Sequence, residues 1–186
     1  MQKPPTNVKL GKTELEIIEM FFAWVIRETS KRPVVKKISS IRNLESLLEP
    51  RKILADHLRT QTQTHSDQVK EALEDFITKN KTDVKLVFPA AGLKNADILP
   101  DVVWKDMIAA LCDGGGDWQV FFHHYPNAAV LFTVSRVGFD HTGTVAIIYL
   151  EEAYCRFRTD GGGLLVVKCE GNKWIYQTTI TSYWTM

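Results

Sequence analysis

The hydrophobic period of this chain changes once, near residue 130, and that change limits the possible folds more than any other feature. Before residue 130, apolar residues recur every three to four positions, which is the spacing of one helix face. After it, apolar and polar residues alternate, which is the spacing of strands. The order predicts an α+β fold in which N-terminal helices pack on a C-terminal antiparallel β-meander with two additional short strands.

Two segments are expected to form the helices that cover the sheet. Residues 13–29 begin with a Thr13–Glu16 capping box and are apolar over most of the helix circumference, so we expect burial on several sides. Residues 66–79 are capped by Ser66 and carry one apolar face. Further helices are expected at residues 44–58, from Pro100 onward and at residues 117–125.

The strands are expected in two groups. Val34–Ile38 and Val84–Phe88 are short strands among the helices. The meander is expected over residues 130–137, 144–151, 164–170 and 173–181, the last two joined by the turn Gly171-Asn172. The connection Glu152–Gly163 is longer than a tight hairpin needs, and Cys169 is expected opposite Ala146.

Length, charge and composition indicate one globular domain over residues 13–186, preceded by a flexible lead-in at residues 1–12. The chain has 186 residues, of which 45% are hydrophobic and 24% charged. Its formal net charge of +1 gives no reason to expect nucleic acid as a partner. No apolar run approaches the roughly 20 residues of a spanning helix, so we expect no integral membrane segment.

Several motifs resemble those of a known protein family. They are Trp118…Phe121-Phe122…Tyr125-Pro126, Ser135-Arg-Val-Gly-Phe139, Ala146…Tyr149 and Gly171-Asn-Lys-Trp174. The pattern resembles a family of uncharacterised bacterial cell-envelope proteins, in which a "W..FY..YP" segment precedes an "SRVGF" strand, an "ALVY" strand and a "GKW" turn. The resemblance implies a bacterial protein exported to the periplasm, envelope or medium after removal of a signal segment; without such a segment it would be cytoplasmic.

The candidate binding residues are Arg136 and four residues of the long connection: Tyr154, Arg156, Phe157 and Arg158. Tyrosine and arginine are enriched at interface hot spots, which favours recognition by this connection. Alternatively, Tyr154 and Phe157 fold back to cover one end of the sheet. Arg136 closes an apolar stripe on its strand, so it needs a carboxylate, solvent or a ligand as its partner.

Signals for catalysis, metals and cofactors are weak. The chain has neither a Gly-x-Ser-x-Gly elbow nor a His-Glu-x-x-His motif. His123 and His124 fall on the outer side of their expected helix, with Asp140 and His141 in a later turn, and we expect no metal site and no cofactor. The glycine triplets lack the residues of a phosphate loop and are interpreted as a helix stop and a flexible hairpin. The acidic pair Glu151-Glu152 points to opposite faces of its strand, and three free cysteine thiols are expected.

These observations favour a non-catalytic interaction or binding module whose partner is an unknown protein or a small ligand. Two alternatives stay open. One is a hydrolase-like enzyme whose site is assembled from distant residues, which motif scanning does not detect. The other is a small-ligand carrier with a pocket between the helices and the sheet.

Overall fold

The computed structural model describes residues 5–39, 60, 65–82, 84–112, 117–128, 130–154 and 160–184. Its α+β fold agrees with the predicted class. Along the chain the elements are β1 (Thr6–Lys9), α1 (Lys12–Thr29), β2 (Val34–Val35), β3 (Ile38–Ser39), α4 (Asp67–Lys79), β4 (Val84–Val87), β5 (Asp97–Ile98), α5 (Asp101–Cys112), α6 (Asp117–His124), β6 (Val130–Val134), β7 (Gly138–Phe139), β8 (Val145–Tyr154), β9 (Asp160–Glu170) and β10 (Lys173–Trp184).

The large sheet contains the predicted meander. It has seven strands, six of them in the order β10-β9-β8-β6-β2-β5, and β7 pairs with β8. The pairs β6–β8, β8–β9 and β9–β10 are antiparallel, as expected. Strand β2 extends the sheet by parallel pairing with β6 and β5. A second sheet joins β1, β4 and β3.

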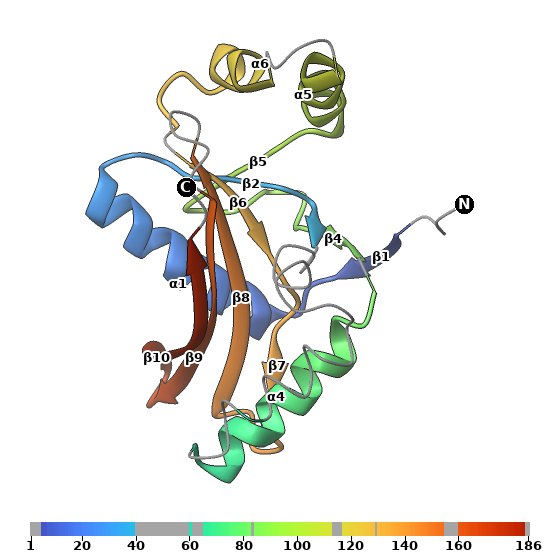
Figure 1. Ribbon diagram of the computed structural model, residues 1–186. Coiled ribbons are helices and arrows are strands. Elements are labelled where there is room, and N and C mark those ends of the chain that lie inside the picture. The colour runs from blue at the N-terminus through green and yellow to red at the C-terminus, as the bar shows by residue number, and fades with distance from the viewer. Residues whose placement is uncertain are drawn as a thin grey trace.

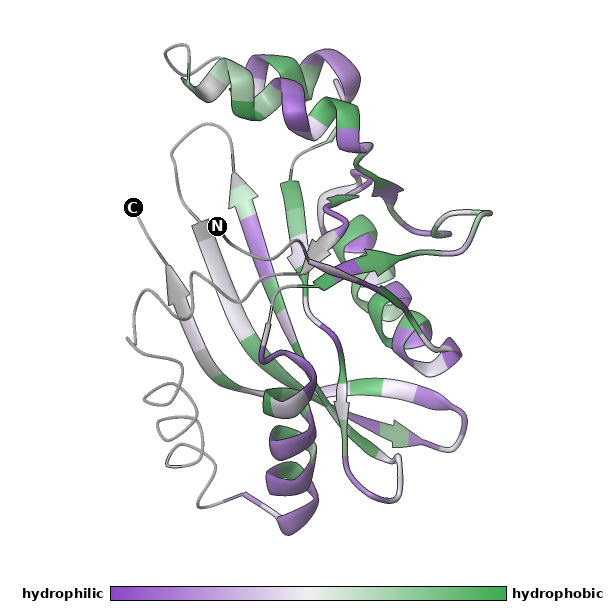
Figure 2. Ribbon diagram, turned by 90° about the vertical axis from the view of Figure 1, so that its right-hand side faces the viewer, coloured by the Kyte–Doolittle hydropathy of each residue, from purple (hydrophilic) through white to green (hydrophobic). Residues whose placement is uncertain are grey.

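Helices α1 and α4 lie against opposite faces of the large sheet (Figure 1). Strand β8 shows why. Its residues Ala146, Ile148 and Leu150 pack in the cluster that contains α1, while Ile147 and Tyr149 pack with α4. Because successive side chains of a strand point to opposite faces, an apolar run such as this one is buried on both sides. The outer side of α4 carries hydrophilic residues (Figure 2).

Helices α5 and α6 form a third cluster at the β2–β6 end of the sheet, at the top of Figure 1. Residues Met107 and Phe121 of the two helices pack there with Leu131 of β6. The predicted helical period of residues 117–125 is therefore confirmed over Asp117–His124. No helix of the described chain combines the length and apolar character that a membrane crossing requires.

The N-terminal region differs from the prediction in two ways. Residues 6–9, expected in a flexible lead-in, form β1 and pair in parallel with β4. Helix α1 begins at Lys12, and its capping interaction runs from the Gly11 N–H to Glu14 Oε2 (2.9 Å) instead of joining Thr13 and Glu16. Glu14 is buried, so its carboxylate can reach this amide from inside the fold.

The meander differs in its strand ends. Strand β6 stops at Val134 and not at residue 137. Strands β8 and β9 continue to Ala153 and Asp160, so most of the expected connection Glu152–Gly163 is paired strand and the glycine triplet lies within β9. Ala146 is paired with Val167, two residues before the predicted Cys169. Among the described cysteines, Cys112 and Cys169 are free thiols; Cys155 and the predicted helices at residues 44–58 lie outside the described residues.

Candidate ligand-binding groove

An open groove of about 760 Å³ lies between α1 and the C-terminal strands of the large sheet. Strands β8 and β9 form its floor, α1 forms one wall and β10 forms the other. We call it the α1–β10 groove. Sites for small molecules commonly have volumes of roughly 300–1,000 Å³, so the size suits such a ligand. Its position between a helix and the sheet matches the location that the sequence suggested for a carrier pocket.

Two glycines keep the floor of the groove open. On β9, Leu165 and Val167 pack on the α1 side of the sheet, and Leu164 and Val166 pack on the α4 side. Strand alternation therefore assigns Gly161 and Gly163 to the α1 side as well. Both line the groove. Because glycine has no side chain, backbone forms the floor where larger residues would fill the space, and a ligand can approach closely.

The walls of the groove are apolar and partly exposed. Helix α1 contributes Met20 and Trp24, and β10 contributes Trp174, Ile175 and Tyr176. Trp24 is 49% exposed, Ile175 40% and Tyr176 50%, although these are large apolar or aromatic side chains. The sequence pattern assigned Trp24 to a helix buried on several sides, and this part of the prediction is wrong. Apolar side chains gathered around an open groove are typical of a binding surface.

The charged residues of the groove gather at one end. Near the middle of α1, Phe22 contacts Phe132 of β6, with ring centroids 5.5 Å apart. Phe132 is paired with Glu152, which in turn is paired with Gly161. Arg27 lies further along α1 than Phe22, beyond the point where the helix contacts Phe132. Arg27 and Glu152 therefore lie toward the Gly161 end of the groove. Among the described residues that line the groove, these two are the charged ones.

Arg136, a candidate binding residue, lies beside the N-terminal end of α1, whereas Arg27 is near the C-terminal end. Its Nε donates to Glu14 Oε1 at 3.1 Å, and the two side chains are 21% and 7% exposed. The Val137 amide donates to the same oxygen at 3.3 Å. Because β6 has already ended, Val137 is not bound to the alternation of the strand, and it joins the α1-side cluster with Phe132 and Val134. We call the contacts of the Glu14 carboxylate with Gly11, Arg136 and Val137 the α1 clasp.

The rest of the Ser135–Phe139 motif connects the clasp to α4. Ser135 Oγ accepts a hydrogen bond from the Tyr149 amide at 2.9 Å. Asn80 bonds both backbone groups of Arg136, its Oδ1 accepting from the amide and its Nδ2 donating to the carbonyl (3.0 Å each). A Cβ on Gly138 would lie 2.3 Å from the Phe76 nitrogen, so only glycine allows α4 this close. The motif that carries the family resemblance thus makes contacts within the fold.

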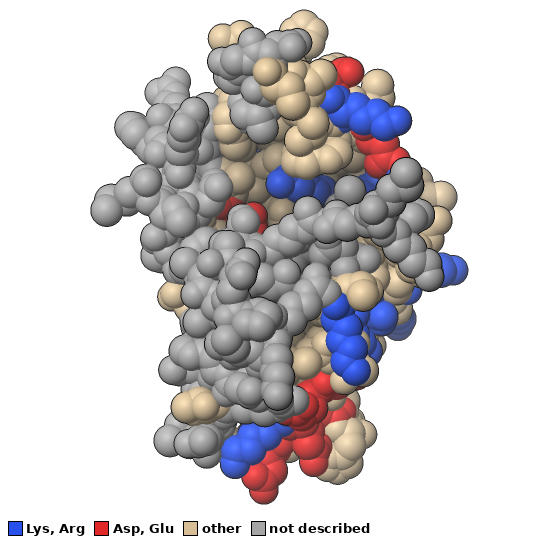
Figure 3. Space-filling model, turned by 45° about the vertical axis from the view of Figure 1, so that its right-hand side comes forward, with Lys and Arg blue, Asp and Glu red and all other residues tan. Residues whose placement is uncertain are grey.

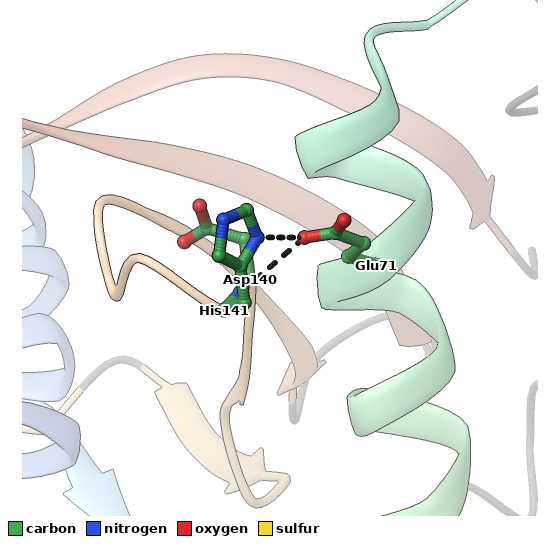
Figure 4. Close-up of side chains that lie close together, drawn as sticks. All are labelled: Glu71, Asp140 and His141. Carbon is green, nitrogen blue, oxygen red and sulfur yellow. Dashed lines mark hydrogen bonds and ion pairs between the residues drawn. The ribbon is translucent and has the colours of Figure 1, made fainter.

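A second polar cluster joins the β7–β8 turn to α4. His141 Nδ1 lies 2.5 Å from Glu71 Oε2, and the Asp140 carboxylate lies on the other side of the imidazole ring (Figure 4). Ligand atoms of these three residues lie within 4.8 Å of one another, as metal ligands could. However, Asp140 Oδ1 accepts from the amides of Thr144 and Val145 (2.8 Å each), and its Oδ2 accepts from Gln68 at 3.1 Å. The cluster is therefore explained by turn formation and an ion pair without an ion.

Electrostatics in this cluster follow from its hydrogen bonds. The bond to Glu71 raises the pKa of His141 above its usual 6.5, and the same bond lowers the pKa of Glu71 below 4.5. Burial by itself would raise the pKa of Asp140, but hydrogen bonds from Thr142, Val145, Thr144 and Gln68 together lower it. Both partners of the Glu71–His141 pair are exposed to solvent, so the pair ties the turn to α4 only weakly.

The other sequence-predicted residues are distributed as follows. Tyr154 is the last residue of β8, and Arg156, Phe157 and Arg158 lie outside the described residues. In the sequence, these residues stand between Glu152 and Gly161, both of which line the groove. Glu151 accepts from the Tyr149 hydroxyl at 3.0 Å on the α4 side, opposite to Glu152 as the alternation predicts.

The histidines that the sequence offered as possible metal ligands lie in two separate places. His123 and His124 are exposed in the last turn of α6, at the top of Figure 1, whereas Asp140 and His141 lie in the turn at the bottom. Among the described residues that line the groove, none is histidine or cysteine. On the described part of the face drawn in Figure 3, Lys and Arg side chains and Asp and Glu side chains both occur.

The groove residues were the functional candidates that the sequence did not identify. The available signal was the Gly161–Gly163 run inside a β-rich region, which typically marks a close approach of a ligand or another backbone. In comparisons with known proteins, the chain matches no family model, no curated protein and no solved structure.

Proposed function

We propose that this protein is a non-catalytic binding protein that holds a small apolar molecule in the α1–β10 groove. One observation carries the proposal: Gly161 and Gly163 place bare backbone where a packed sheet would carry α1-facing side chains. Trp24, Trp174 and Tyr176 then offer aromatic surface to whatever occupies the space. Transfer of an apolar ligand of ordinary size from water to such a site is favourable by roughly 25 cal/mol for each Å² buried.

The residues of the groove support binding better than catalysis. The described lining includes the hydroxyl groups of Thr179 and Ser182 and one carboxylate, that of Glu152, but no histidine base and no cysteine nucleophile. Acid–base catalysis needs a base within hydrogen-bond reach of the proton it removes. Of the three functions that the sequence left open, the carrier has the structural feature it requires, because a pocket lies between helix and sheet.

The test is to fill the groove. We expect the neutral fluorophore N-phenyl-1-naphthylamine to bind to the wild-type protein with enhanced emission. Gly163→Val should place a side chain in the floor and weaken binding at least 10-fold. Lys168→Val is the matched control, because it adds the same side chain to the same strand at an exposed position, and it should change the affinity less than 2-fold. Wild-type affinity in a folded Gly163→Val protein would contradict the proposal.

Export from a bacterial cell is the second part of the proposal. It is supported by the resemblance of Ser135–Phe139 and the neighbouring motifs to those of envelope proteins. Expression of the native gene in its own host, followed by fractionation of cytoplasm, periplasm, membrane and medium, tests it. We expect the protein outside the cytoplasm, and recovery only from the cytoplasmic fraction would overturn this part.

A further inference from the structure

The α1–β10 groove has chemically different ends, and this difference restricts its ligand. Toward the Trp174 end, the lining is apolar, with Met20 on α1 and Leu165 on β9. Toward the Gly161 end, it includes Arg27, Glu152 and Ser182. Ser182 is paired with Gly163, which confirms that this part of β10 lies at the same end. An occupant that satisfies both ends is apolar along one part and polar at the other.

The side chain with spare hydrogen-bond donors at the polar end is a cation. Arg27 Nε donates to Glu28 Oε1 at 3.2 Å, and neither of its terminal nitrogens has a hydrogen-bond partner among the described residues. The ion pair with Glu28 is exposed on both sides, 73% and 52%, so it holds the guanidinium only weakly. A guanidinium fork matches the geometry of a carboxylate or a phosphate.

In the described structure, Glu152 does not form an ion pair that would remove the preference of Arg27 for an anion. The ion pairs between described residues do not include one between Glu152 and Arg27. Glu152 has an interaction of its own. Arg27 is therefore the charged residue at this end whose two terminal nitrogens donate to no protein group in the described structure, and it is complementary to an anion.

We infer that the ligand of the groove is an amphiphile with one apolar tail and an anionic head, bound with the head at Arg27 and the tail directed toward Trp174. The inference rests on the proposed function and adds the ligand class and its orientation. Met20 and Arg27 are two helical turns apart, roughly 10 Å, which is the length of an alkyl chain of about eight carbons. A medium-chain carboxylate or alkyl phosphate has this chemistry.

Three ligands with ten-carbon chains test the head group. Decanoate, decan-1-ol and decyltrimethylammonium are each titrated against N-phenyl-1-naphthylamine bound to the full chain, below their aggregation concentrations. We expect decanoate to bind at least 10-fold more tightly than decyltrimethylammonium. Decyl phosphate in place of decanoate separates a phosphate preference from a carboxylate preference.

Two variants assign the effect to Arg27. Arg27→Gln should weaken decanoate binding at least 5-fold and leave decan-1-ol binding within 2-fold. Lys31→Gln removes a nearby exposed cation that does not line the groove, and it should leave both affinities within 2-fold. Equal binding of all three ligands, with no effect of Arg27→Gln, would overturn the head-group inference while the groove still binds. Failure of every ligand and of the fluorophore to bind would overturn the proposed function as well.

Discussion

The two ends of α1 lie against the same face of the same sheet, and they make opposite kinds of contact. At its N-terminal end, Glu14 is buried and bonded to Gly11, Arg136 and Val137. At its C-terminal end, Trp24 and Arg27 face the α1–β10 groove. The helix is continuous over Lys12–Thr29, so the difference does not come from the helix backbone. It comes from the segments opposite each end, the β6–β7 connection at the first and β9 and β10 at the second.

The α1 clasp contributes to the stability of the fold, whereas the α1–β10 groove is available for binding. A buried carboxylate must be paired, and the α1 clasp supplies a guanidinium and two amides. Where β9 presents Gly161 and Gly163, no side chain meets α1 and the helix leaves space. We therefore expect substitutions in the first region to change stability, and substitutions in the second to change ligand affinity.

The largest expected effect compares two aromatic residues of α1. Phe22 is 0% exposed and contacts Phe132, whereas Trp24 is 49% exposed at the groove. Phe22→Ala should lower the free energy of unfolding by about 4 kcal/mol, because it leaves a cavity in the core. Trp24→Ala should lower it by less than about 1 kcal/mol, as expected for a half-exposed side chain. Urea unfolding followed by circular dichroism measures both, and similar losses would remove the distinction between the two regions.

The next effect concerns the close approach of α4 to β7. Gly138→Ala places a Cβ within 2.5 Å of three backbone atoms of α4, and backbone cannot give way as a flexible side chain can. We expect a loss of about 3 kcal/mol in the free energy of unfolding. Gly11→Ala is the control, because its Cβ would meet only Glu14 Oε2 at an ordinary 3.5 Å. An equally stable Gly138→Ala protein would show that α4 is not held at this distance.

The charge of the clasp is tested by Glu14→Gln. The amide still accepts hydrogen bonds, but Arg136 loses its counter-charge at a site where it is only 21% exposed. We expect a loss of about 2 kcal/mol, below the full cost of breaking a buried pair because Arg136 retains some contact with water. Glu16→Gln, on the exposed side of α1, removes a 3.8 Å surface pair with Lys12 and should cost less than about 0.5 kcal/mol. Equal effects of the two variants would show that burial of Glu14 contributes nothing.

The smallest effect is the pH dependence of the contact between the β7–β8 turn and α4. His141 has a raised pKa, so its contribution is complete below the unfolded value near 6.5 and is lost as the pH rises through the folded pKa. Glu71 has a lowered pKa, so its contribution is present above 4.5 and is lost as the pH falls through its folded pKa. The contact should be strongest between these values.

A titration of the His141 ring by NMR checks this prediction. We expect a midpoint above 6.5 in the wild-type protein and a lower midpoint in Glu71→Gln, because the hydrogen bond to Glu71 is the largest cause of the shift. An unchanged His141 midpoint in the Glu71→Gln protein would show that this ion pair does not form in solution.

Local sequence determined the type and approximate place of most elements. The helical period over residues 66–79 and the cap at Ser66 produce α4, and the alternation after residue 130 produces the four-stranded meander. Strand ends were less predictable. The extension of β8 and β9 toward residues 154 and 160 depends on cross-strand pairing. The glycine and charged residues in these extensions give no local sequence signal for a strand.

The candidate site followed from the sequence only in part. A pocket between helix and sheet was among the alternatives, and Arg136 was expected to need a partner. The identity of that partner, Glu14, could not be predicted, because the two residues are 122 positions apart in the sequence. Trp24 was assigned to the core because its neighbours in α1 are apolar. Whether such a side chain is covered depends on the residue that faces it across space.

The sequence by itself therefore determined the order of helices and strands, since hydrophobic period and capping residues act within a few positions of the chain. Only the tertiary structure decided which end of α1 is closed and which is open. That outcome depends on what the β6–β7 connection and β9 place opposite the helix: Arg136 beside Glu14 at one end, and the bare backbone of Gly161 and Gly163 at the other. A buried charge requires its partner and a glycine leaves a space, but both effects appear only when distant segments meet.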